Sequence, residues 1–123
     1  MRVRVCKGHA MTPGWIMAIV DSGSPYCLFR ADIALAIGIK NLTTGKAHEI
    51  GGVKKGAVDI YYFHNVKLFI EGNWVIEVMA GFSASLSVPA LLGRNGFYDN
   101  FIVNFDHSAS PPVMSISKID KVQ

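Results

Sequence analysis

Short runs of β-branched and aromatic residues, separated by glycine, proline and polar turns, form the dominant pattern of this chain. Residues 1–5 alternate between apolar and basic side chains, and Phe101, Val103 and Phe105 share one side of a second alternating run. Alternation with a period of two is typical of β-strands. Further strands are predicted at 15–20, which we expect to be buried, and at 57–70, 74–80 and 113–119. Many short strands with such turns predict an all-β domain, either a closed β-barrel or a sandwich.

Helix signals are few. Residues 30–37 are good helix formers and precede Gly38, a residue type that commonly follows the last turn of a helix. Residues 95–100 are expected to add one or two helical turns. Glu71-Gly72-Asn73 separates two strand-like runs and predicts a hairpin turn. The expected fold is therefore all-β with one or two short helices.

The 123 residues suit one domain spanning residues 1–123, in which the role of the tail at 108–123 is left open. Because hydrophobic residues make up 50% and charged residues 17% of the chain, disorder is excluded. The net charge is only +3 and the basic residues are scattered along the chain, so no nucleic-acid-binding surface is predicted. No apolar run reaches the ~18 residues of a membrane helix, and no signal peptide is seen. A cytoplasmic protein is expected, while the sequence leaves open whether the chain is a fragment of a larger one.

The cysteine and histidine residues predict no metal site. Cys6 and Cys27 are expected to be free thiols, with a single bridge as the alternative, and the apolar surroundings of Cys27 predict burial. The histidines lack metal-ligand spacing among themselves and with the cysteines. No metal and no cofactor are therefore expected.

One carboxylate stands where a catalytic acid would be held rigidly. Asp21 directly follows the apolar run at 15–20, and Ser22 adds a short hydroxyl. Gly23 allows the backbone to come close enough for its N–H to point at the carboxylate. The same three residues are also common in ordinary turns, so alone they favour a turn over a catalytic site.

Two further segments change this interpretation. Residues 89–98 contain Leu92-Gly93-Arg94-Asn95 between two strand-like stretches, and residues 49–53 form a glycine-centred tip. Together with Asp21-Ser22-Gly23, and in this order, these segments resemble the retropepsin-like aspartic proteases, in particular the cellular and bacterial-type members. The resemblance spans roughly residues 1 to 107 and implies a retropepsin-like β-barrel domain with a glycine-rich flap hairpin.

The resemblance implies an aspartic endopeptidase in which Asp21 is catalytic and is supported by Ser22 and Gly23. Aspartic proteolysis needs two carboxylates that share one proton, and this chain has a single Asp-Ser-Gly. The implied enzyme is therefore a homodimer with one Asp21 from each subunit at the two-fold axis. The alternative is a catalytically silent module of the same fold that serves dimerisation or peptide binding.

The resemblance also implies how a peptide or protein substrate is held. An extended peptide would lie between the flap and the floor of the site, and apolar residues beside the cut are expected. The implied substrate-contacting residues are Ser24, Tyr26, Ile50, Gly51, Gly52, Val53, Pro89 and Leu91. For Tyr26, Pro89 and Leu91, packing in the core is an equal alternative.

Gly93 and Arg94 are implied structural residues. In viral members the corresponding arginine pairs with an acid that follows the catalytic triplet, but here Pro25-Tyr26 occupies that stretch. Arg94 is therefore expected to bond to a backbone carbonyl or to Asp99 instead.

Overall fold

A computed structural model of the chain describes residues 1–51 and 58–120. Strands dominate it, with one short α-helix, α1 (Ala31–Ala36), and one 3-10 helix, η1 (Leu42–Thr44). The strands are β1 (Arg2–Lys7), β2 (Ala10–Met11), β3 (Ile16–Val20), β4 (Leu28–Arg30), β5 (Lys46–Gly51), β6 (Val58–Ile70), β7 (Trp74–Ser83), β8 (Ala90–Leu92), β9 (Phe101–Asp106) and β10 (Val113–Lys118).

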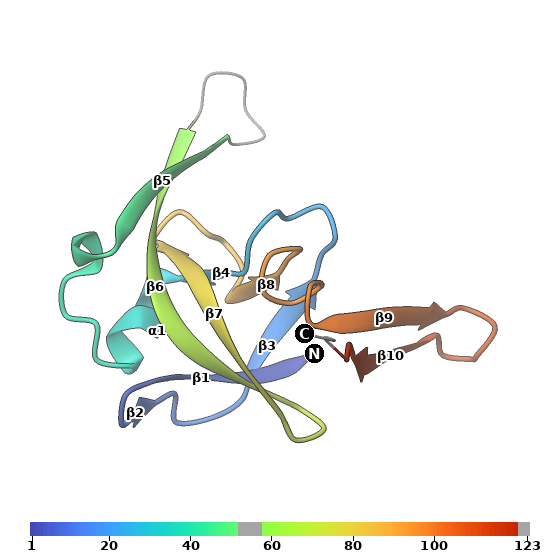
Figure 1. Ribbon diagram of the computed structural model, residues 1–123. Helices are drawn as coiled ribbons and strands as arrows, with labels where there is room; N and C mark the ends of the chain where they lie inside the picture. The colour runs from blue at the N-terminus through green and yellow to red at the C-terminus, as the bar shows by residue number, and fades with distance from the viewer. Residues whose placement is uncertain (52–57, 121–123) are drawn as a thin grey trace.

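Six of these strands close into a barrel, which confirms the all-β prediction. The order runs β1-β3-β8-β4-β7-β6, and pairing of β1 with β6 completes the ring (Figure 1). Strands β2 and β5 extend this sheet beyond β1 and β6. Because β1 also pairs with β6, each of the six strands has a hydrogen-bonded neighbour on both sides, so the sheet is a barrel rather than a sandwich.

Apolar side chains that alternate along the strands fill the barrel. Val3 and Val5 of β1 face Leu68 and Ile70 of β6, and all four are buried. The rings of Phe29 and Phe82 stack with centroids 5.6 Å apart. The largest fully buried side chains are Phe29, Phe82, Phe97, Phe101, Ile37, Leu68, Ile70, Leu92, Val3, Val5 and Cys27.

The predicted helix is confirmed at α1. It buries Ile33 and Ala34, and Gly38 follows it with a φ of +85°, a conformation that a residue with a side chain adopts only with strain. The hairpin turn at 71–73 is confirmed as well, since Gly72 and Asn73 have φ values of +94° and +70°.

Two local predictions are wrong. Strand β3 is not buried on both faces: Ala18 is buried, but Met17 and Ile19 are 62% and 50% exposed on the outside of the barrel wall, as is Trp15 just before the strand at 50%. Residues 96–100 form successive turns rather than a helix. There Gly96 has a φ of +107°, which interrupts helical geometry, and its carbonyl accepts a hydrogen bond from the Asn100 side chain.

The tail forms a ribbon with the preceding strand. β10 pairs antiparallel with β9 along the full length of both strands, from Val113 opposite Asp106 to Lys118 opposite Phe101. This two-stranded ribbon extends away from the barrel (Figure 1).

The two thiols lie in different surroundings and should react differently. Both cysteines are free, as expected; Cys27 is fully buried, and burial raises its pKa to about 11. Because the thiolate is the reactive species, we expect a thiol reagent at pH 8 to modify the partly exposed Cys6 in the folded protein and Cys27 only after unfolding. Intact-protein mass spectrometry reports the order, and rapid modification of both thiols in the folded protein would contradict this packing.

Candidate active site

Asp21 stands at the end of a fixed strand. β3 pairs in parallel with β8, and the Asp21 N–H continues this ladder by donating to the Leu92 carbonyl at 3.0 Å. The carboxylate is partly exposed, and its Oδ1 accepts the Gly23 N–H at 2.9 Å. The predicted bond from Gly23 to this carboxylate is therefore present, and it fixes the orientation of the carboxylate.

The segment that follows β8 clamps the loop after Asp21. The backbone N–H of Arg94 donates to the Ser24 carbonyl at 2.9 Å, and the backbone N–H of Asn95 donates to the Pro25 carbonyl at 2.9 Å. The Asn95 side chain adds a second bond to the Pro25 carbonyl at 2.8 Å. The two segments singled out by sequence, which lie about seventy residues apart, thus form one unit.

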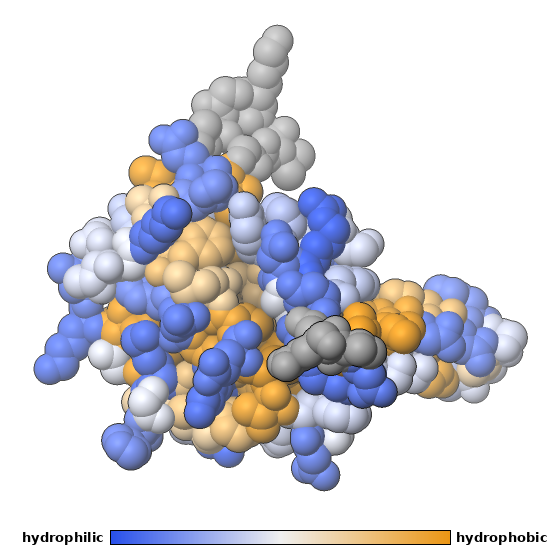
Figure 2. All heavy atoms as spheres, in the orientation of Figure 1, coloured by the Kyte–Doolittle hydropathy of each residue, from blue (hydrophilic) through white to orange (hydrophobic). Residues whose placement is uncertain are grey.

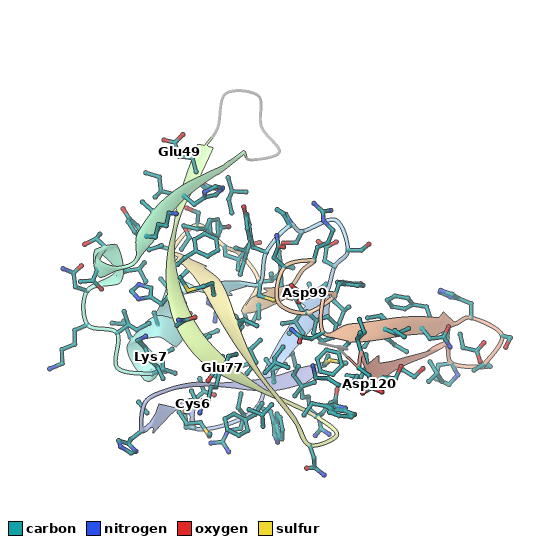
Figure 3. The ribbon with its side chains drawn as sticks, viewed as in Figure 1. Cys6, Lys7, Glu49, Glu77, Asp99 and Asp120 are labelled. Carbon is teal, nitrogen blue, oxygen red and sulfur yellow. The ribbon has the colours of Figure 1, made fainter. Side chains whose placement is uncertain are left out.

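Arg94 bonds to a carbonyl rather than to Asp99. Its Nη1 donates to the Ser22 carbonyl at 2.9 Å, one of the two partners expected from sequence. Asp99, labelled in Figure 3, instead accepts the N–H of Gly96 and a side-chain N–H of Asn100. The guanidinium therefore holds the residue next to Asp21 in place.

Close packing against the backbone of Ser24 and Tyr26 requires a glycine at position 93. A Cβ at this position would lie closer than 3.0 Å to the carbonyl oxygens of Tyr26 and Ser24. Only glycine lets the two segments approach to this distance.

An apolar floor adjoins the carboxylate. In the parallel pairing Ile19 lies opposite Leu91, and strand alternation puts Ile19 on the same face as Asp21. Ile19 is half exposed and Leu91 is partly exposed. Pro89 is partly exposed too and comes just before β8, where its carbonyl accepts the Arg30 N–H. A side chain bound next to Asp21 would meet Ile19 and Leu91.

Tyr26 lines a cavity of about 270 Å³, which strands β5, β6 and β7 complete. Its ring meets those of His48 and Phe63 edge-on, with centroids 5.4 Å and 5.1 Å away. The Tyr26 hydroxyl lies 3.5 Å from His48 Nε2. The residues that line the cavity are Tyr26, Lys46, His48, Phe63 and Met79.

The other predicted site residues occupy different positions. Ser22 is exposed, whereas Ser24 is buried and its hydroxyl donates to the Tyr26 carbonyl at 2.7 Å, so this hydroxyl is engaged within the loop. Ile50 and Gly51 lie at the end of β5, paired with β6, in a hairpin that rises beyond the barrel (Figure 1). Gly52 and Val53 lie outside the described residues.

Several residues near Asp21 and Tyr26 were not predicted from the sequence, because the strand topology places them there. Ile19 could have been found from alternation, because it lies two positions before Asp21 on the same strand. His48, Phe63 and Met79 carried no comparable signal, since only the pairing of distant strands brings them to Tyr26.

In the described parts of the chain, 1–51 and 58–120, no three His, Cys, Asp or Glu side chains are placed to share a metal ion. Within those same ranges, no helix has the length and apolar character needed to cross a membrane.

Comparison with known proteins gives no assignment: the chain matches no protein-family model, no curated protein and no solved structure.

Proposed function

We propose that this chain is a retropepsin-like aspartic endopeptidase that works as a homodimer. The observation that supports it most strongly is the joining of the two motifs: the backbone of the loop that carries the partly exposed Asp21 carboxylate is hydrogen-bonded to the segment 92–95. An ordinary turn needs no such clamp from residues so distant in the sequence. Rigid placement of a carboxylate is what proton transfer in catalysis demands.

The chemistry follows from pairing two such carboxylates. Two carboxyl groups about 3 Å apart do not both ionise, because their negative charges would repel each other, so one Asp21 stays protonated. The ionised Asp21 takes a proton from water while the water oxygen bonds to the scissile carbonyl carbon. The protonated Asp21 gives its proton to the carbonyl oxygen. The diol collapses when the Asp21 that took the water proton gives it to the amide nitrogen, the other Asp21 takes a proton from a diol hydroxyl, and the C–N bond breaks to leave an acid and an amine.

The substrate is an extended peptide with apolar side chains beside the cut. The floor formed by Ile19 and Leu91 accepts one of them, and the cavity at Tyr26 accepts another. The hairpin of β5 and β6 serves as the flap, and backbone pairing with an extended peptide provides affinity that depends little on sequence.

The test is a cleavage assay on a library of unstructured peptides at chain concentrations from nanomolar to high micromolar. We expect cuts between apolar residues, fastest at acid to mildly acidic pH, because the reaction needs two carboxyl groups that share one proton. A statine-type mimic of the tetrahedral diol should block them. Binding of peptides without any cleavage across this range would favour the silent peptide-binding module.

Ile19→Ser should weaken catalysis on apolar substrates. Removing most of an apolar contact in a substrate pocket costs roughly 1–3 kcal/mol in transition-state binding, so kcat/KM should fall about tenfold to a hundredfold. Ile19 is half exposed, so folding should be retained. Leu35→Ser is the matched control, since Leu35 is 68% exposed on α1, outside the proposed site. Equal effects of the two variants on kcat/KM would show that Ile19 does not contact the substrate.

A further inference from the structure

A cavity that the proposed reaction does not use lies at the far end of β3 from Asp21. It has a volume of about 420 Å³ and is formed where the turn at 71–73 approaches Trp15 and Arg2. Trp15 directly precedes β3 and Asp21 directly follows it, so the length of the strand separates the cavity from the candidate active site. The turn is also at the opposite end of β6 from the hairpin with β5 (Figure 1). Figure 2 shows hydrophobic surface where β6 and β7 approach this turn.

Aromatic rings with fixed orientations line this cavity. Both tryptophans of the chain, Trp15 and Trp74, contribute to it, together with Phe69. The Trp74 ring packs edge-on against Phe101 of the core, with ring centroids 5.8 Å apart, so it is held from inside the barrel. The Trp15 ring is held from outside, because the guanidinium carbon of Arg2 lies 5.6 Å from its centroid. The rings are therefore positioned before any ligand arrives.

The polar groups at the cavity are mainly hydrogen-bond donors. Of the described residues that line it, Glu71 alone carries a carboxylate. Both oxygens of that carboxylate are engaged by Arg2, whose backbone N–H donates to Oε1 at 2.9 Å and whose Nε donates to Oε2 at 3.2 Å. Guanidinium and indole N–H groups only donate. The indole nitrogen of Trp74 lies at the turn, since a Cβ at Gly72 would be 3.5 Å from it.

This combination favours a ligand that is apolar, rigid and rich in acceptors. A proline-rich segment has these properties: its rings pack on aromatic faces, its backbone carbonyls stand free in the polyproline II conformation, and proline has no N–H that would need an acceptor. The segment is already extended, so binding costs it little conformational entropy. A sugar fits less well, because each hydroxyl also donates and the carboxylate of the cavity is already occupied by Arg2.

We propose that the cavity between Trp15 and Trp74 binds a proline-rich segment of another protein. Proline rings pack against the two indoles and Phe69, and the segment's carbonyls accept hydrogen bonds from the indole N–H groups and from Arg2. The proposal goes beyond the proposed function and does not depend on it, because the cavity lies apart from Asp21 and is complete within one chain.

The first test measures binding of decaproline to the full chain by isothermal titration calorimetry. We expect saturable binding with a dissociation constant below about 1 mM, and no binding in this range for a glycine-serine peptide of equal length. Because both tryptophans line the cavity, their fluorescence should change along the same titration curve. Absence of decaproline binding, or binding of maltohexaose in its place, would overturn the proposal.

The second test compares two exposed residues on the outer face of β3 and just before it. Trp15 is 50% exposed and lines the cavity, whereas Met17 is 62% exposed and lies outside it, so alanine at either position should leave the barrel folded, as circular dichroism can verify. We expect Trp15→Ala to raise the dissociation constant of decaproline about tenfold or more. We expect Met17→Ala to change it less than about threefold. Equal effects of the two variants would overturn the proposal.

A variant on another wall of the cavity guards against a folding defect in Trp15→Ala. Val75 lines the cavity from β7 and is 50% exposed. Val75→Asp sets a carboxylate against the acceptor carbonyls of the peptide, so it should also weaken decaproline binding about tenfold. Unchanged binding in this variant would show that the peptide lies elsewhere on the chain.

Discussion

Replacing Asp21 by asparagine should abolish peptide cleavage and leave the barrel folded. Asparagine neither gives nor takes a proton at this position, and loss of general acid–base catalysis should slow the reaction about a thousandfold or more. The amide oxygen can still accept the Gly23 N–H that now bonds Asp21 Oδ1 at 2.9 Å, so the turn should survive. The measurement is kcat/KM on a peptide substrate together with the thermal unfolding midpoint.

Asp106→Asn is the matched control for this variant. Asp106 makes the same local bond, accepting the Ser108 N–H at 2.9 Å from two residues ahead, but it lies at the far end of β9. We expect its variant to retain cleavage within about twofold, as for other exposed substitutions. If Asp21→Asn also retains cleavage, Asp21 is not the catalyst.

Gly93→Ala should have the largest effect on stability. The added Cβ would lie closer than 3.0 Å to two carbonyl oxygens, those of Tyr26 and Ser24, and both belong to backbone that cannot swing aside. Overpacking of this kind typically costs about 1–3 kcal/mol, and the rigid backbone partners place this site at or above the upper end. Urea unfolding should show the lower free energy of unfolding. The folded fraction of the variant should cleave peptides poorly, because the segment after β8 no longer holds the Asp21 loop in place.

Gly14→Ala provides the comparison. A Cβ at Gly14 would meet no atom within 4 Å, so we expect the free energy of unfolding to change by no more than about 0.5 kcal/mol. If both alanine variants lower the free energy of unfolding by similar amounts, the backbone at Gly93 does not pack tightly against Ser24 and Tyr26.

Local features of the site could be predicted from the sequence. The bond from Gly23 to Asp21 involves residues two apart, and the carbonyl partner of Arg94 was one of two expected. The first expectation needs only turn chemistry. The second came from the family resemblance together with the absence of an acid at Pro25-Tyr26. The all-β class followed from alternation in residues such as Val3, Val5 and Phe101, which all proved buried, but this alternation left a barrel and a sandwich open.

Features set by distant pairing could not be predicted. Insertion of β8 between β3 and β4 brings Leu91 next to Ile19, and no local pattern encodes this order. The exposure of Met17 was misjudged for a related reason: an apolar run looks the same whether it is covered within the chain or left open. Likewise, the pairing of β10 with β9 rather than with another element depends on the complete topology.

The central claim, that one Asp21 from each of two chains forms the catalytic pair, is tested most directly by mixing subunits. A fixed amount of the wild-type chain is equilibrated with increasing amounts of the Asp21→Asn chain, and peptide cleavage is measured. Mixed pairs hold a single carboxylate, so at tenfold excess of the variant we expect the rate to fall to about a tenth by mass action. A rate that stays constant as the variant is added would show that each chain acts alone and would contradict the shared site.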